Sequence, residues 1–476
     1  MKTVDIIITH GYVFTMEGEG TGCIPDGAVA IHGNRITAVG KTEEICKEYS
    51  AHRYIDAANK AVLPGFIDTH VHSTNAIMRG CSQDINKWMY SGILPLLGLA
   101  TTEDLVAGSM LNIIESVKNG TTTFCDYDFP MLEVIKNHVK VGTRAYAAEM
   151  INELPSVTYG VMDTSLRDFD PAKGEKQLSD AVKLIEEYHE SQNGRIKCMF
   201  GPQATEMVSV PLLKEIKSLS KKYGVDIHMH VAQSERETRQ VQERYGLRPV
   251  ELLDRLGYLD SHLHAAHIIE TTDAERKLMA EKGVSMALCT ASLGIIDGIL
   301  PPAQEYMQYN GRVGLGTDQA PGNNCMNMFN EMKFTALMHK YKNQDPTIMP
   351  AWKVLRMATI EAAEAMNMNE EIGSLKSGKK ADIILVDLDA PAMSPVFDWP
   401  VRNIVPNLVY SANGSEVSTV IIDGNIIVED GILLTVNEEE EISKVNKISA
   451  RLSRELGQKS WSSELPLAIL TAERKY

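Results

Sequence analysis

Hydrophobic and polar residues alternate near both ends of the chain, in the period-two pattern that predicts β-strands. The alternation runs through most of residues 1–58 and returns in 380–388 and 417–432. The last of these segments also carries a hairpin-turn signal in its Asp-Gly-Asn sequence. We therefore expect residues 1–58 and 373–435 to combine into one small β-sandwich that flanks the rest of the chain.

Between these ends, strand-like and helix-like segments alternate, which is typical of an α/β fold with a parallel sheet. Eight strands separated by helices over about 260 residues match the size of a (β/α)₈ TIM barrel. We therefore predict such a barrel over residues 59–372, because the glycine-rich motifs of a doubly wound nucleotide-binding sheet are missing. The strand-like segments are VLPGFIDTHVH, TTTFCDYD, TRAYAAEMI, RIKCMFGPQAT, VDIHMHVAQ, LHAAHII, VSMALCT and RVGLGTD.

The helical segments carry end signals of their own. Thr101 is a plausible N-cap followed by acidic residues, and that helix closes at Gly120. Residues 436–476 begin with a run of glutamates and continue at helical spacing. They predict a charged C-terminal helical extension with a solvated start.

Charge and composition argue against a nucleic-acid-binding, membrane-spanning or disulfide-rich protein. A net charge of −16 argues against nucleic acid as a partner, and no apolar run reaches the roughly 18 residues that span a membrane. The seven cysteines are scattered and form no C-x-x-C pair, as in proteins of a reducing compartment. We expect a cytoplasmic protein that contacts neither nucleic acid nor membrane.

Residues suited to metal binding stand where the predicted strands end. His70 and His72 close the first strand, and side chains two apart in a strand share one side. Such a pair alone is a weak signal. However, His230 ends the fifth strand, His267 the sixth and Asp318 the eighth. Because chemistry in a barrel sits at the carboxyl ends of its strands, these residues together predict a metal centre.

Each of these side chains has an expected role. His70, His72, His230 and Asp318 are the predicted ligands, with one position left for water, as catalytic metal sites require. A metal in this setting lowers the pKa of its water from about 16 to about 7. Asp318 is then placed to take the proton, and His267 to polarise the substrate or stabilise the attacking hydroxide.

Four motifs resemble the amidohydrolase superfamily, and most closely its branch of nucleoside, nucleobase and s-triazine hydrolases. That branch includes methylthioadenosine/S-adenosylhomocysteine deaminases and atrazine chlorohydrolase. The resemblance implies a (β/α)₈ barrel with a flanking β-sandwich, a single Zn²⁺ or Fe²⁺ on the predicted ligands, a small heterocyclic substrate, and a homo-oligomer, dimeric or larger. The motifs are PGFIDTHVH, HMHVAQ, AAHIIE and GLGTDQAPGNN.

The chain departs from this branch where substrate is recognised. Gln233 stands where the branch usually has a glutamate that protonates the ring nitrogen. An amide can donate a hydrogen bond but cannot shuttle a proton. Gln203 replaces the usual histidine after the fourth strand, and the usual Ser-Asn pair is absent from 289–298. We expect Gln203 and Gln233 to contact substrate, and Trp88, followed by Met89, to stack on a planar ring.

Three hypotheses account for Gln233. Another acid replaces the glutamate, the substrate needs less acid assistance, or the protein binds a heterocycle without turnover. The intact ligand set favours an enzyme that exchanges an exocyclic amino group for hydroxyl and releases ammonia. Displacement of chloride or an alkylamine from an s-triazine-like ring is the alternative. The acids considered as replacements are Glu235, Glu149, Asp126 and Asp128.

Overall fold

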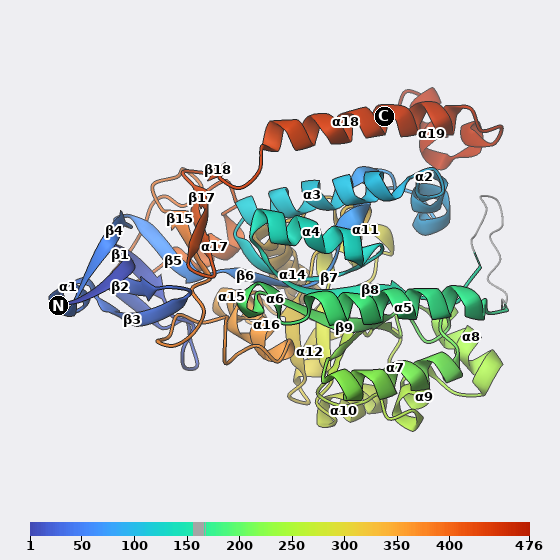
Figure 1. The fold of residues 1–476 in the computed structure, drawn as a ribbon, viewed down its shortest axis with the longest axis horizontal. Coiled ribbons are helices and arrows are strands. Elements are labelled where there is room, and N and C mark those ends of the chain that lie inside the picture. The colour runs from blue at the N-terminus through green and yellow to red at the C-terminus, as the bar shows by residue number, and fades with distance from the viewer. Residues whose placement is uncertain (156–165, 167) are drawn as a thin grey trace.

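The computed structural model describes residues 1–155, 166 and 168–476. Figure 1 shows a sheet close to the N-terminus at one end of the molecule and a larger α/β body beside it. The helices of the body lie outside its strands. The α/β class predicted from the sequence is confirmed.

The strands of the body form one parallel sheet, ordered β13-β12-β11-β10-β9-β8-β7-β6-β14. The sheet is curled, since β14 follows β13 in the chain yet pairs with β6, where Asp318 lies opposite Val71. The strands are β6 (Phe66–His72), β7 (Thr121–Asp128), β8 (Arg144–Ile151), β9 (Ile196–Pro202), β10 (Ile227–Val231), β11 (Leu263–His267), β12 (Ser285–Leu288), β13 (Arg312–Leu315) and β14 (Asp318–Gln319).

Every residue of β6, β7 and β8 is buried, as expected for strands covered on both faces. The helices of the body and its connections are α2 (Leu94–Leu97), α3 (Thr102–Lys118), α4 (Met131–Val141), α5 (Pro171–Tyr188), α6 (Ser191–Gly194), α7 (Val210–Tyr223), α8 (Glu235–Tyr245), α9 (Pro249–Arg255), α10 (Asp273–Glu281), α11 (Thr290–Ile296), α12 (Ala303–Met307), α13 (Ala320–Asn323), α14 (Met328–Asn343), α15 (Ala351–Met357) and α16 (Ile360–Ala365). Short 3₁₀ and π turns span Ser73–Met78 and Met89–Ile93.

The predicted boundaries of α3 are confirmed, and their cause is visible. Thr101 accepts a hydrogen bond from the Asp104 backbone, while the Asp104 carboxylate accepts one from the Thr101 backbone. This reciprocal capping box satisfies two backbone N–H groups that the first turn leaves free. Gly120, just after the helix, has φ +91° and lets the chain turn directly into β7.

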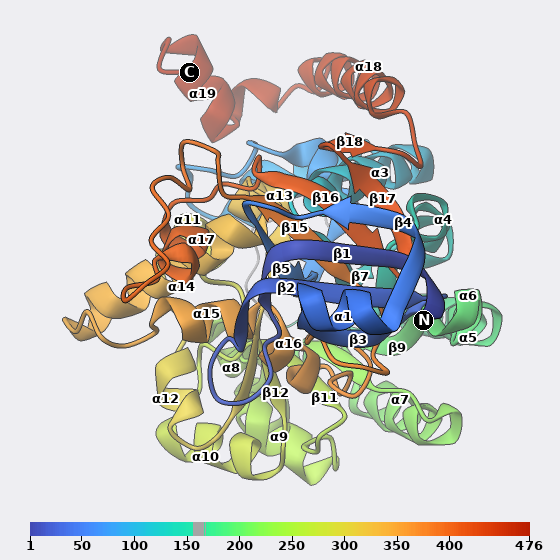
Figure 2. The same cartoon turned by 90° about the vertical axis from the view of Figure 1, so that its left-hand side faces the viewer.

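Both ends of the chain contribute to a second, mixed sheet, as the alternation predicted. Its order is β18-β17-β16-β15-β5-β1-β2-β3, with β4 parallel to β1, and Figure 2 views it from the side on which β1 to β3 lie in front. Its strands, listed with the two helices that lie between them in the sequence, are β1 (Lys2–Phe14), β2 (Cys23–His32), β3 (Arg35–Lys41), α1 (Thr42–Glu48), β4 (Tyr49–Asp56), β5 (Lys60–Pro64), β15 (Ile383–Asp387), α17 (Ile404–Tyr410), β16 (Val417–Ile422), β17 (Asn425–Glu429) and β18 (Ile432–Leu433).

The segment VLPGFIDTHVH, interpreted as one strand, is two. β5 pairs with β1 and β15 in the terminal sheet, whereas β6 belongs to the parallel sheet. The chain crosses between the sheets at Gly65, where a Cβ atom would lie only 2.2 Å from the Thr122 side chain. The absence of a side chain at Gly65 therefore permits the close passage that joins the two sheets.

The C-terminal residues form α18 (Glu438–Gly457), a short 3₁₀ turn (Ser462–Glu464) and α19 (Pro466–Ala472). α18 lies along α3 (Figure 1), and Lys118 donates to Glu438 at 2.6 Å. Of the described helices, none alone is long and apolar enough to cross a membrane. The segments 89–97 and 102–118 meet that test only as a pair bent by 117°.

Candidate active site

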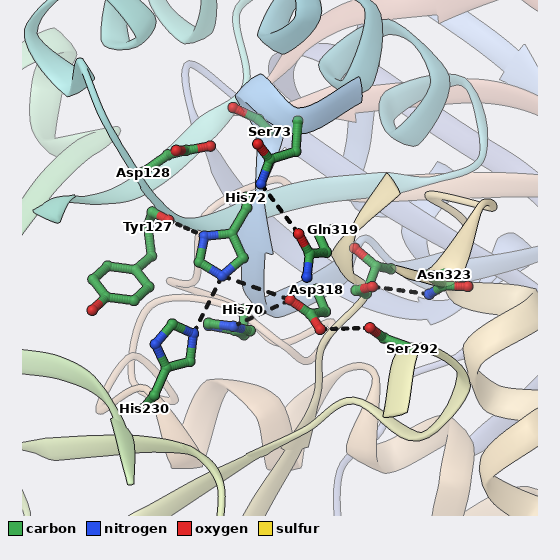
Figure 3. Close-up of polar contacts among 12 residues, drawn as sticks. His70, His72, Ser73, Tyr127, Asp128, His230, Ser292, Asp318, Gln319 and Asn323 are labelled. Atoms are coloured by element: carbon green, nitrogen blue, oxygen red, sulfur yellow. Dashed lines mark hydrogen bonds and ion pairs between the residues drawn. The ribbon is translucent and has the colours of Figure 1, made fainter. Parts of the chain in front are cut away.

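The four predicted metal ligands, which come from three strands, converge at the carboxyl edge of the parallel sheet (Figure 3). His70 and His72 project from β6, His230 from β10, and Asp318 opens β14. The pairing of β14 with β6 brings Asp318 beside the two histidines. All four side chains are buried.

Hydrogen bonds to Nδ1 orient the imidazole rings of His70, His72 and His230 alike. In each ring Nδ1 is occupied by a polar neighbour, which leaves Nε2 facing the shared space. A carbonyl oxygen can only accept, so the two rings bonded to carbonyls carry their proton on Nδ1 and present an Nε2 lone pair. The contacts are His70 Nδ1 to His228 Nε2 at 2.7 Å, His72 Nδ1 to the Tyr127 carbonyl at 2.5 Å, and His230 Nδ1 to the Gln203 carbonyl at 2.9 Å.

The free atoms of these side chains fit a divalent metal. His72 Nε2 lies 3.3 Å from His230 Nε2, about the separation of two ligands of a tetrahedral ion at 2.0–2.1 Å bond lengths. Asp318 Oδ1 lies 3.7 Å from His70 Nε2 and 3.6 Å from His72 Nε2, while its Oδ2 accepts a 2.5 Å hydrogen bond from Ser292. Among the described residues His70 Nε2 has no hydrogen-bond partner, and burying it so is costly unless a metal occupies it.

His267 completes the cluster from the end of β11. Its ring stacks on that of His230 with centroids 5.2 Å apart, and neither of its nitrogens has a partner in the described structure. One of its nitrogens also lies within 4.8 Å of ligand atoms of His70 and Asp318. His267 and Asp318 have φ of +77° and +63°, a strained conformation for such residues that is concentrated at functional sites.

Burial sets the protonation of the cluster. It lowers the pKa of His72 to about 4 and, together with the neighbouring His72, that of His267 to about 3. It also raises the pKa of Asp318 to about 7, against the Ser292 hydrogen bond. The imidazoles are therefore neutral at neutral pH, which is the form that binds metals.

A cavity of about 430 Å³ opens beside these residues, and His72, His230 and Asp318 form part of its wall. Its size is within the range of small-molecule sites. The sequence-predicted substrate contacts Trp88, Gln203 and Gln233 line it, as does Met89.

Two of these contacts are held by hydrogen bonds. The Trp88 indole donates to Asp297 at 2.9 Å, which fixes the ring in the wall. The Gln203 amide oxygen accepts from Asn152 at 2.7 Å, so its NH₂ group can donate into the cavity.

The four acids considered as replacements for the family glutamate differ in whether they line the cavity. Asp128 lines the cavity and accepts from Thr74; burial raises its pKa to about 7. Glu235 is exposed, and the cavity wall includes neither it, Glu149 nor Asp126. Of these four acids, only Asp128 is in position to meet a substrate.

Sequence reasoning missed two residues of the site. One is His228, two residues before His230 in the motif HMHVAQ, whose ring contacts that of His70. Glu206, in the loop after β9, is buried and lines the cavity. No motif marks Glu206; its place four residues after a strand end was the one available signal.

Comparison with known proteins agrees with this geometry. The family model described as "Amidohydrolase family" matches residues 61–427. A 5'-deoxyadenosine deaminase of Methanosarcina mazei is 35% identical over 451 residues, covering 94% of this chain and 98% of the relative. A 5-methylthioadenosine/S-adenosylhomocysteine deaminase of Pelotomaculum thermopropionicum is 32% identical, covering 94% and 99%.

Solved structures give the same picture. An adenosine deaminase from Xanthomonas campestris with bound zinc superposes with a TM-score of 0.87 at 25% identity, covering 95% of this chain and 99% of that one. Atrazine chlorohydrolase from Arthrobacter aurescens TC1, complexed with zinc, has a TM-score of 0.82 at 22% identity and shares the fold over 93% and 100%. The resemblance seen in the four sequence motifs is confirmed: the chain belongs to the amidohydrolase family.

Proposed function

We propose that the protein is a mononuclear metal-dependent hydrolase that replaces an exocyclic amino group of an aromatic N-heterocycle with hydroxyl and releases ammonia. The convergence of three Nε2 atoms and one Asp318 oxygen beside a ring-sized cavity carries this proposal. The deaminase names of the relatives that span nearly the whole chain support it. An adenosine-like nucleoside, a nucleobase or an aminotriazine is the proposed substrate class.

His70, His72, His230 and Asp318 are the proposed ligands of one divalent ion, Zn²⁺ in preference to Fe²⁺. The mixed nitrogen and oxygen donor set suits zinc, and zinc is bound in two structural neighbours. Bound there, the ion supplies a Lewis acid that makes water acidic enough to attack near neutral pH.

In the proposed reaction Asp318 transfers the proton, and the other side chains of the site position the water and the ring. Asp318 accepts one proton from the attacking water and delivers it to the departing amine, so that water and the amine become ring hydroxyl and ammonia. Neutral His267, close to both Asp318 and His70, orients the water or substrate. Gln233 donates an amide hydrogen bond to the ring without transferring a proton, and Trp88 and Gln203 position the ring.

Displacement of chloride or an alkylamine from an s-triazine-like ring is the second candidate reaction. The neutral amide of Gln233 favours it, because a good leaving group on an electron-poor ring needs less acid assistance. A heterocycle-binding protein without turnover is the remaining alternative.

The architecture proposed with this function is a closed (β/α)₈ barrel over residues 59–372, of which β5 pairs with the terminal sheet instead. Residues 1–58 and 373–435 form the flanking β-sandwich, and 436–476 the helical extension. The return of β14 to β6 supports closure of the barrel. We also propose a homo-oligomer in the cytoplasm that needs neither nucleic acid nor a membrane.

The test is a screen of amino- and chloro-substituted purines, pyrimidines and triazines, in which ammonia, alkylamine and chloride release are measured with protein-bound metal. We expect stoichiometric metal and ammonia release that a chelator stops. Asp318→Ala is expected to lose at least about 100-fold in kcat/KM. Full activity without metal, or in Asp318→Ala, would contradict the mechanism.

A further inference from the structure

Glu206 is a buried carboxylate in the cavity wall, and one of its two oxygens has no hydrogen-bond partner among the described residues. Its side chain is 2% exposed and forms part of the cavity wall. Arg236 donates to Oε1 at 2.9 Å, whereas Oε2 is buried without any hydrogen-bond partner in the described structure. Leaving a buried carboxylate oxygen unpaired costs free energy, and a hydrogen-bond donor on a bound molecule removes that cost.

Arg236 fixes both the charge and the direction of this carboxylate. Burial disfavours the guanidinium charge, but Glu206 and Tyr90 together outweigh it and raise the pKa of Arg236. The two charges cancel overall, so the pair has no net charge with which to select a cation. Oε2 is the acceptor that this ion pair leaves unsatisfied, and an ionised carboxylate oxygen is a strong acceptor for a neutral donor group.

Glu206 lies near Gln233, which stands where the resembled hydrolase branch usually has a glutamate. Gln233 and Arg236 are three residues apart at the start of α8, and both line the cavity. The Gln233 backbone donates to Glu237 at 2.8 Å, and burial together with the Glu206 charge raises the pKa of Glu237. Glu206 therefore lies in the part of the cavity wall that Gln233 and Arg236 form.

We propose that Glu206 is a specificity-determining residue whose Oε2 accepts a hydrogen bond from a neutral N–H or O–H donor of the substrate. This inference rests on the proposed function and narrows its substrate class to heterocycles that carry such a donor away from the reacting carbon. The donor belongs either to the ring system, as an amino group or ring N–H, or to a sugar hydroxyl.

The variant Glu206→Gln reverses this recognition with little change of shape. Arg236 holds the amide oxygen, so the NH₂ group takes the place of Oε2 and the acceptor becomes a donor. Exposed Glu243 on the same helix supplies the matched control Glu243→Gln.

The experiment measures kcat/KM on substrate pairs that differ by a single kind of donor, with metal-loaded protein. One pair is 2,6-diaminopurine and adenine, a second is adenosine and its 2',3'-dideoxy analogue, and a third is an N-monoalkyl and an N,N-dialkyl aminotriazine. We expect wild type and Glu243→Gln to prefer the donor-bearing member of at least one pair. In Glu206→Gln that preference falls by about 10- to 100-fold.

The preference is the ratio of the two kcat/KM values of a substrate pair, measured on the same variant. A lower fraction of folded protein reduces both values equally and leaves the ratio unchanged. The pair that responds identifies whether the donor is a ring substituent or a hydroxyl. Equal preference in wild type and Glu206→Gln for every pair overturns the assignment, as does a wild type that prefers no donor-bearing member.

The experiment also distinguishes failure of the proposed hydrolase function from failure of the Glu206 assignment. If wild type releases no ammonia, alkylamine or chloride, the same pairs are compared by calorimetric binding instead of turnover. A donor preference in binding that Glu206→Gln loses then supports Glu206 and contradicts only the hydrolase. Equal binding preference in both proteins contradicts Glu206.

Discussion

His70 Nδ1 lies 2.7 Å from Nε2 of His228, two residues before His230 in β10. For His70 to present Nε2 to a metal, its Nδ1–H must donate to His228, which makes His228 the acceptor. The Cys125 thiol lies 3.5 Å from the other nitrogen of His228 and extends the chain of contacts. A buried residue with no direct part in the metal site thus orients one of its ligands.

Removing this support is expected to weaken the metal site. In His228→Ala, His70 loses the partner that selects its tautomer, and metal affinity should fall by about 10- to 100-fold. The measurement is metal retention in competition with a chelator. His264→Ala is the control, since His264 lies opposite His228 on β11 but bonds to Asp226 and Ser285. Equal affinity in His228→Ala and wild type would show that His228 does not orient the ligand.

Gln233→Glu is expected to restore acid assistance at the cavity wall. A protonated glutamate can donate to the ring nitrogen, so kcat/KM for aminopurines should rise by about 10-fold or more at low pH and decline as that carboxyl ionises. Chlorotriazine turnover should change by less than about 3-fold, because chloride departs without a proton. The check is a pH profile for both substrates beside the exposed control Gln242→Glu. An unchanged profile would place Gln233 away from the chemistry.

Glu149 predicts a pH dependence of stability. Burial raises the pKa of its carboxyl to about 8, although the Met131 backbone donates to it at 2.7 Å. The folded state therefore binds more protons than the unfolded state between about pH 4.5 and pH 8. Protonated Glu149 therefore stabilises the folded state at low pH, and this stabilisation is lost as the pH rises through 8. Over that range the free energy of unfolding falls by up to about 1.4 kcal/mol per pH unit.

Glu149→Gln is expected to flatten that slope, because the amide cannot ionise. The measurement is denaturant unfolding of metal-loaded protein from pH 5 to pH 8.5, compared with the exposed control Glu175→Gln. Parallel curves for Glu149→Gln and wild type would refute the assignment.

Arg144 joins the two sheets through a buried ion network. It donates from the start of β8 to Asp382 at 2.7 and 3.1 Å and to Asp423 at 3.1 Å, beside β15 and in the β16–β17 turn. Arg144→Met leaves the buried Asp382 without its cationic partner, removes one of the two cations beside Asp423, and should cost about 3–5 kcal/mol of unfolding free energy. The exposed pair of Arg53 with Glu429 is the control, and Arg53→Met should cost less than about 1 kcal/mol. Denaturant unfolding measures both, and equal losses would contradict the buried role.

Much of the fold was predictable because its signals are local. The caps at Thr101 and Gly120 act within a few residues of α3, and the alternation at both ends marks strands wherever they pair. The crossing at Gly65 was not predictable, because its cause is Thr122, which belongs to a different strand. The Pro64-Gly65 pair marks a break in the run, but it does not show that the two halves pair with different sheets.

The sequence by itself determined the metal-binding residue types, since His70 and His72 must share a side of one strand and His230, His267 and Asp318 stand at other strand ends. Only the tertiary structure decided which nitrogen each ring presents, because the Tyr127 and Gln203 carbonyls and His228 come from other strands or their ends. It likewise decided that Glu206 meets the cavity while Glu235 remains in solvent. Hydrogen-bond partners and burial depend on contacts between distant segments, and residue type and spacing do not encode those contacts.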